Sequence, residues 1–223
     1  MNFLRSLLAI LTKDVITELR TREMLSSMLV FALLTVLIFS FALDLRAATA
    51  QQTAPGVLWV TVAFAGSLGL SRSMAQEEQN RCFDGMLLAP MDRSTIYLGK
   101  AIGNFFFITL VEAVVLPVFA VLFNLPVFRA GVLLTLLLGT AGYAAVGTLF
   151  ATMAVNTRAR EVMLPILLLP AAVPVLMAAV RATGGFLEAL PIADVAYWLR
   201  LLVVYDVIIV TVSTMLFDFV VEE

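Results

Sequence analysis

The sequence predicts an all-α membrane protein with six transmembrane helices, and three observations carry this prediction. Hydrophobic residues make up 62% of the 223-residue chain and charged residues only 13%, whereas soluble domains carry about 25% charged residues. The mean hydropathy is +1.04. The uncharged runs are long enough to cross a bilayer as helices, and they lack the alternating pattern of β-barrel strands.

The first expected element is an amphipathic helix over residues 3–22. Leucine and valine recur there at steps of three and four residues, and polar or charged residues fill the other face. This modest length and charged face favour a position in the plane of the membrane interface. The apolar positions are Leu4, Leu7, Leu8, Leu11, Val15 and Leu19.

Six spans are then expected, because a helix needs about 20 mostly apolar residues to cross about 30 Å of hydrocarbon. The third contains Glu112 and the sixth contains Asp206, while Thr183-Gly184-Gly185 predicts a turn after the fifth. No linker or repeat divides the chain, so we treat residues 1–223 as one transmembrane domain. The expected spans are residues 24–43, 54–74, 97–123, 130–155, 162–180 and 196–217.

The distribution of basic residues predicts the orientation of these spans. With the N-terminus inside, ten of the 14 Lys and Arg residues fall on the cytoplasmic side and four on the other. Basic residues near span ends resist translocation. Both termini are therefore expected in the cytoplasm.

One sizeable polar loop, residues 76–93, falls on the cytoplasmic side in this topology. Glu77 and Glu78 favour a helix start, Leu87 belongs to an apolar patch, and Pro90 disfavours helix continuation. An exposed apolar patch fits a docking surface for a soluble partner. The same residues also fit a solvated connector, and the loop by itself leaves both readings open.

Glu112 and Asp206 stand out because an ionisable group at membrane depth costs roughly 2.5 to 3.5 kcal/mol on insertion scales. Each is a candidate functional residue, or a protonated or hydrogen-bonded carboxyl that joins two helices. A protease dyad would need the two carboxyls to meet, which nothing in the sequence indicates. Close helix packing is expected at the glycines of the spans, namely Gly99, Gly103, Gly139, Gly142 and Gly147.

Composition and motifs exclude several kinds of chemistry. With 14 Lys and Arg against 16 Asp and Glu, the net charge of −2 leaves no basic surface for nucleic acid. The chain has no histidine and one cysteine, so it lacks the ligands and bases of common zinc, haem and Ser-His sites. The string from Ser94 to Ala101 ends like a phosphate loop but lacks its first glycine and its final Ser or Thr. We expect no catalytic residue, cofactor site or metal site in this chain.

Four stretches resemble a known family. Asp84-Gly85 followed by Met-Leu-Leu-Ala-Pro90, with Ile96-Tyr-Leu-Gly-Lys100, resembles the coupling helix between spans two and three of type-2 ABC exporter permeases (ABC-2, type V). The stretches 54–59, 136–140 and 164–183 are similar to the haem exporter B (CcmB) family of cytochrome c maturation. The resemblance covers residues 54–185 well and the two ends by topology.

This resemblance implies a permease subunit of the bacterial inner membrane that is not itself an enzyme. It implies a cytoplasmic ABC ATP-binding subunit, a haem-handling membrane subunit, a haem chaperone and a homodimer within the complex. ATP would be bound by the partner and would drive haem delivery or release of the haem chaperone. The alternative is an ABC-2 permease that exports a drug, lipid or polysaccharide. The implied contacts with the ATPase are Glu77, Glu78, Arg81, Phe83, Asp84, Gly85, Leu87 and Pro90.

The composition adds one expectation about haem. Without histidine, this chain could ligate haem only through Met, Tyr or Cys82. We therefore expect the complex to handle haem while this subunit acts as a mechanical coupler.

Overall fold

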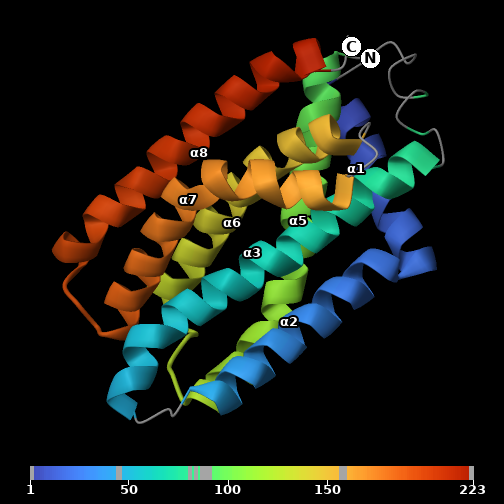
Figure 1. Ribbon diagram of the computed structural model, residues 1–223. Coiled ribbons are helices and arrows are strands. Elements are labelled where there is room, and N and C mark those ends of the chain that lie inside the picture. Colours follow the sequence, from blue (N-terminus) through green and yellow to red (C-terminus); the bar gives the residue numbers. More distant parts are fainter. Residues whose placement is uncertain are drawn as a thin grey trace.

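The computed structural model describes residues 3–43, 47–79, 82, 85, 92–155 and 160–220. Within these residues the chain is helical, with no strand (Figure 1). The long helices are α1 (Phe3–Thr21), α2 (Glu23–Ala42), α3 (Ala47–Gln79), α5 (Arg93–Phe123), α6 (Ala130–Val155), α7 (Arg160–Leu187) and α8 (Ile192–Val220).

The six predicted membrane spans are confirmed. The helices from α2 to α8 are each long and apolar enough to cross a bilayer, and α1 is not among them. The ends differ at α3, which begins at Ala47 and ends at Gln79 instead of covering residues 54–74, and at α7, which continues to Leu187 instead of stopping at residue 180. The predicted turn at Thr183-Gly184-Gly185 is wrong, because Thr183 and Gly185 are buried against neighbouring helices and continue the helix.

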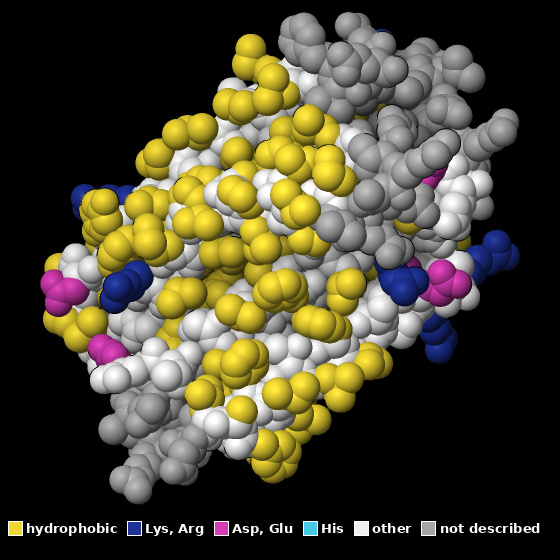
Figure 2. Space-filling model, viewed as in Figure 1, with side chains coloured by type: hydrophobic (Ala, Val, Ile, Leu, Met, Phe, Trp, Pro, Cys, Tyr) yellow, Lys and Arg dark blue, Asp and Glu magenta, His cyan; other side chains and the backbone are white. Residues whose placement is uncertain are grey.

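The exposed surface matches a chain that lies in lipid. Figure 2 shows hydrophobic side chains over the middle of the visible face, with charged side chains toward its two ends. The outermost span is α8, of whose most apolar window only 11% is buried. Its exposed residues include Val204, Val207 and Met215. The protein is therefore a multi-pass membrane protein.

Helix α6 forms the centre of the bundle because its glycines let large side chains approach. A Cβ atom at Gly139 would overlap the Trp59 indole of α3, and one at Gly147 would overlap Leu70. Two phenols also cross between helices. Tyr143 donates to the Ala63 carbonyl at 2.5 Å, and Tyr97 donates to the Ala145 carbonyl at 3.0 Å. The expected packing role of the α6 glycines is confirmed.

Helix α1 packs on the bundle through its polar face. Ser6, Ile10 and Glu18 are buried, whereas Leu4 and Leu19 of the leucine face are 68% and 64% exposed. Part of the leucine face is thus exposed, as expected for a helix in the interface plane, whereas Val15 of the same face packs against the core of the bundle. In Figure 1, α1 lies at the end of the bundle where α5 begins and α8 ends.

Candidate functional site

The predicted ATPase contacts begin in the last turn of α3 and continue along the chain toward α5. Glu77 and Glu78 belong to the last turn of α3, and Gly85 is helical and exposed. A Cβ atom at Gly85 would have no neighbour within 4 Å. The remaining predicted contacts, Arg81, Phe83, Asp84, Leu87 and Pro90, lie outside the described residues.

Glu77 belongs to a cluster of four charged side chains, which we call the ionic cluster: Lys13, Asp14, Glu77 and Lys100. The Lys100 ammonium contacts Asp14 Oδ1 at 2.8 Å, Asp14 Oδ2 at 2.9 Å and Glu77 Oε1 at 2.5 Å. The Lys13 ammonium contacts Glu77 Oε1 at 2.6 Å and Oε2 at 2.8 Å. Two cations and two anions therefore balance in one place.

Burial decides what the ionic cluster contributes. The side chain of Lys100 is 1% exposed, and those of Asp14 and Glu77 are 10% and 11% exposed. Removing one member of a buried ion pair leaves an uncompensated charge, which costs about 3 to 5 kcal/mol. The ionic cluster is therefore a joint that resists being pulled apart.

The pKa of Lys13, at the edge of the ionic cluster, reflects two opposing effects: burial and the nearby carboxylates. Burial by itself would lower the pKa of this ammonium. The negative charges and hydrogen bonds of Asp14 and Glu77 outweigh burial and hold the pKa above its usual value of 10.5. Lys13 therefore stays charged at physiological pH.

Two glycines of α5 bring α1 close enough to form the ionic cluster. A Cβ atom at Gly99 would lie 3.1 Å from the Ile10 side chain, and one at Gly103 would lie 3.4 Å from Asp14 Oδ2. The expected packing role of Gly99 and Gly103 is thus confirmed, and the helix they receive is α1. Lys100 lies between these two glycines along α5, and its ammonium contacts Asp14 of the same neighbour.

Another carboxylate, in the last turn of α1, joins this helix to α2. Glu18 is 2% exposed and accepts a hydrogen bond from the Leu25 backbone N–H at 2.8 Å. Leu25 lies in the first turn of α2, whose cap residue Arg22 has a left-handed φ of 55°. Because the first N–H groups of a helix lack partners within it, this carboxylate caps α2. Helix α1 is therefore joined to α3 and α5 through its middle and to α2 near its C-terminal end.

The ionic cluster joins both ends of the segment that contains the predicted ATPase contacts. Glu77 lies just before residues 80–91, and Lys100 lies in the second turn after them. Lys13 and Asp14 connect both to α1. Sequence reasoning used both lysines for orientation, Lys13 also for the polar face of the first helix and Lys100 also for the family resemblance, but it did not predict that they pair. The signal that could have found Lys100 is a lysine inside an otherwise apolar span, which needs a buried partner.

The two intramembrane carboxyls lie on different sides of α6. Glu112 is 5% exposed and accepts a hydrogen bond from the Thr140 hydroxyl at 2.5 Å. Asp206 of α8 packs against Gly142, and its buried Oδ1 has no partner among the described residues. Residues 140 and 142 are about 200° apart around a helix. Glu112 and Asp206 therefore do not form a carboxyl dyad, and Glu112 joins α5 to α6.

The comparison with family models follows this geometry. The chain matches the model described as CcmB protein over residues 5–222. The matched residues include all four members of the ionic cluster and all six spans.

Curated relatives agree with the family match. The chain is 28% identical to heme exporter protein B of Pseudomonas aeruginosa over 176 residues, which cover 78% of this chain and 79% of the relative. It is 28% identical to heme exporter protein B of Rhodobacter capsulatus, covering 84% and 88%. It is 29% identical to that of Bradyrhizobium diazoefficiens, covering 80% and 81%. This chain, with its six spans and its α1 joined to both sides of the polar segment, belongs to the CcmB protein family.

Proposed function

We propose that this chain is the membrane permease subunit of an ATP-driven complex for cytochrome c biogenesis. A separate ATP-binding subunit hydrolyses ATP, and this chain couples that work to haem delivery or to release of the haem chaperone. The observation that carries the proposal is the family match over residues 5–222 together with relatives named heme exporter protein B.

In this proposal the ATP-binding subunit docks on residues 76–93 from the cytoplasm. The ionic cluster supports such a role, because it joins α3 and α5 at the two sides of this segment and connects both to α1. A push on the segment then moves three helices together, since separating any one exposes an unpaired buried charge. The chain acts as a mechanical coupler.

Haem is handled by the other members of the complex in this proposal, and ATP by the partner subunit. The absence of histidine from the sequence supports this division, because histidine is the most common haem ligand. The partners are the ATP-binding subunit, a haem-handling membrane subunit, the haem chaperone and a second copy of this chain. The complex lies in the bacterial inner membrane with both termini of this chain in the cytoplasm.

The sharpest test of the docking position is Gly85→Trp. Because the position is exposed and has open space around it, a bulky side chain there obstructs a partner and not this chain. We expect covalent haem on c-type cytochromes to fall at least about tenfold, with the amount of inserted protein unchanged. Haem staining of membranes and an immunoblot of the tagged chain measure both quantities.

Gly56→Trp is the matched control. Gly56 also has no atom within 4 Å of a built Cβ, and it lies on α3 far from residues 76–93. This variant is expected to mature cytochromes normally. Full maturation with Gly85→Trp, at a normal protein level, would contradict the docking position. Reversing the charge of Glu77 is a poorer test, because it would break the ionic cluster as well.

Co-purification tests the whole assignment. The tagged chain is extracted from its native membrane in mild detergent, and its companions are identified by mass spectrometry. An ABC ATPase with haem-handling proteins is the expected result. An ATPase alone would favour an exporter of a drug, lipid or polysaccharide, and reproducible absence of any ATPase would overturn the permease assignment.

A further inference from the structure

A cavity of about 500 Å³, lined by both charged and apolar side chains, lies at the end of the bundle away from α1. Three spans have one of their ends here. The span in α3 begins at Gln52, that in α7 ends at Leu187 and that in α8 begins at Ile192. Span ends lie at the depth of lipid headgroups. The lining residues that the argument uses are Pro55, Arg181, Gly184, Glu188, Asp194 and Trp198.

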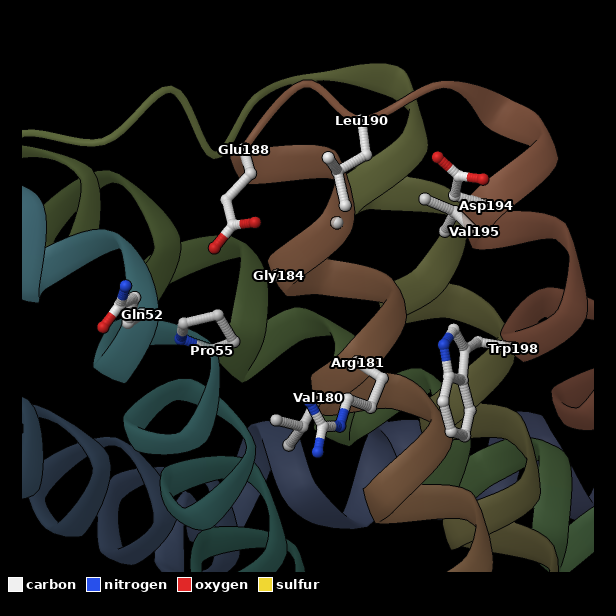
Figure 3. Close-up of a pocket in the computed structure, with 11 residues that line it drawn as sticks. Gln52, Pro55, Val180, Arg181, Gly184, Glu188, Leu190, Asp194, Val195 and Trp198 are labelled. Atoms are coloured by element: carbon white, nitrogen blue, oxygen red, sulfur yellow. The ribbon is translucent and has the colours of Figure 1, made fainter.

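The charged side chains of this cavity differ from those of the ionic cluster, because among the described residues they form no ion pair. None of the described carboxylates forms an ion pair with Arg181, and Arg181, Glu188 and Asp194 are all exposed. Figure 3 shows the Arg181 and Glu188 side chains on either side of Gly184, with Asp194 and Trp198 on the neighbouring helix. One cation and two anions thus line one space, and none of them forms an ion pair with another described residue.

Two consecutive glycines keep this space open. A Cβ atom at Gly184 would meet only Pro55, at 3.6 Å, so a side chain would fit at this position. Because the residue is glycine, that space stays empty. A Cβ atom at Gly185 would lie 2.7 Å from Val195, so this glycine lets α7 approach α8 closely. Pro55 on one side and Trp198 on the other form walls around the helix surface (Figure 3).

This set of groups selects a ligand with charges of both signs. A guanidinium binds a phosphate through two parallel hydrogen bonds. One cation against two carboxylates leaves the lining with a net negative charge, which disfavours a ligand that carries only negative charge. The carboxylates accept hydrogen bonds and therefore suit an ammonium group with N–H donors. An indole at headgroup depth is typical of the membrane interface.

We propose that this cavity binds a zwitterionic headgroup in which a phosphate is joined to a primary ammonium, as in phosphatidylethanolamine. The phosphate lies on Arg181, and the ammonium lies between Glu188 and Asp194. The source is a lipid of the surrounding bilayer, because the cavity lies where three spans meet the headgroup region. The proposal is independent of the function proposed above.

The test uses the fluorescence of the full-length protein in detergent during titration with dihexanoyl phosphatidylethanolamine. Trp198 lines the cavity, whereas Trp59, the other tryptophan, is 1% exposed and donates to the Thr183 hydroxyl. We expect a saturable change in emission. Dihexanoyl phosphatidylglycerol and free phosphoethanolamine are titrated in parallel, and both are expected to bind at least about tenfold more weakly.

Variants separate the cavity from the rest of the surface. Arg181→Gln is expected to weaken binding of the ethanolamine lipid about tenfold or more, and Gly184→Leu is expected to abolish it by filling the space. Arg200→Gln is the matched control, because Arg200 is an exposed arginine of α8 that does not line the cavity. It should change the affinity less than about twofold.

Several results would overturn the proposal. These are the absence of a saturable change, equal affinity of the wild type and Arg181→Gln, or equal binding of phosphatidylglycerol. Equal binding of free phosphoethanolamine would overturn the lipid as the source and assign the cavity to a soluble zwitterion. The Glu188→Gln, Asp194→Asn double variant should bind both lipids alike, and retained preference for ethanolamine would contradict the ammonium position.

Discussion

The two ends of the helical bundle treat charge in opposite ways. At the α1 end, Lys13, Asp14, Glu77 and Lys100 meet within hydrogen-bonding distance, and all but the partly exposed Lys13 are largely buried. At the other end, Arg181, Glu188 and Asp194 line an open cavity. Both sets mix cations and anions, so their composition does not distinguish them.

The difference teaches which charges hold the fold together and which are available to a ligand. A buried and balanced set stabilises the contacts between helices, and removing one member is costly. Exposed charges contribute little to stability, typically about 0 to 1 kcal/mol for a surface pair. The ionic cluster is therefore a structural joint near the proposed ATPase contact, whereas the cavity is suited to binding.

Substitution of one cation at each end should give the largest contrast. Lys100→Met leaves Asp14 and Glu77 with one lysine, so we expect the free energy of unfolding to fall by about 3 to 5 kcal/mol. Arg181→Met should change it by no more than about 0.5 kcal/mol. Unfolding by sodium dodecyl sulfate in mixed micelles, followed by tryptophan fluorescence, measures both.

A second substitution tests whether charge balance is the cause. Lys100→Met combined with Glu77→Gln leaves Lys13 and Asp14, one cation and one anion. We expect the double variant to regain most of the stability that Lys100→Met loses. The loss of stability from Glu77→Gln alone is measured as well. If the losses from Lys100→Met and from Glu77→Gln simply add in the double variant, Lys100 stabilises the protein through packing and not through the balance of charge.

The glycines of the two ends should respond differently to an added methyl group. Gly99→Ala brings Cβ within 3.1 Å of Ile10, whereas Gly184→Ala meets Pro55 at an ordinary 3.6 Å. Because both positions are helical, the gain in helix propensity is the same in both. Gly99→Ala should therefore be less stable than Gly184→Ala by about 1 to 2 kcal/mol. Equal stability would show that α1 is not closely packed on α5.

High pH should weaken the α1 end through Lys13. The folded pKa of Lys13 is raised above 10.5, so its contribution is fully present below the unfolded pKa and is lost as pH rises through the folded pKa. Unfolding measured from pH 9 to 12 should show this loss, which is the smallest of the expected effects. Lys13→Arg should reduce it, because arginine stays protonated over this range. An unchanged profile would contradict the role of Lys13.

Particular residues show how far the sequence alone could lead to the site. The interfacial helix and Gly99 were assigned from periodicity and spacing, and both assignments agree with the structure. Glu77 was assigned to a partner contact, which stays a prediction, while its contacts with Lys13 and Lys100 were missed. These residues are 64 and 23 positions away from Glu77 in the chain, so no local pattern relates them.

The sequence by itself determined the class of the protein and its six spans. Backbone polar groups have no partner in lipid, so every uncharged run of sufficient length must form a helix whatever its neighbours are. Only the tertiary structure decided which face of α1 is buried, and that Thr183, Gly184 and Gly185 continue α7. It also decided which charges are paired at one end and open at the other. These features depend on contacts between side chains of different helices. The pattern of hydrophobicity along the sequence contains no information about such contacts.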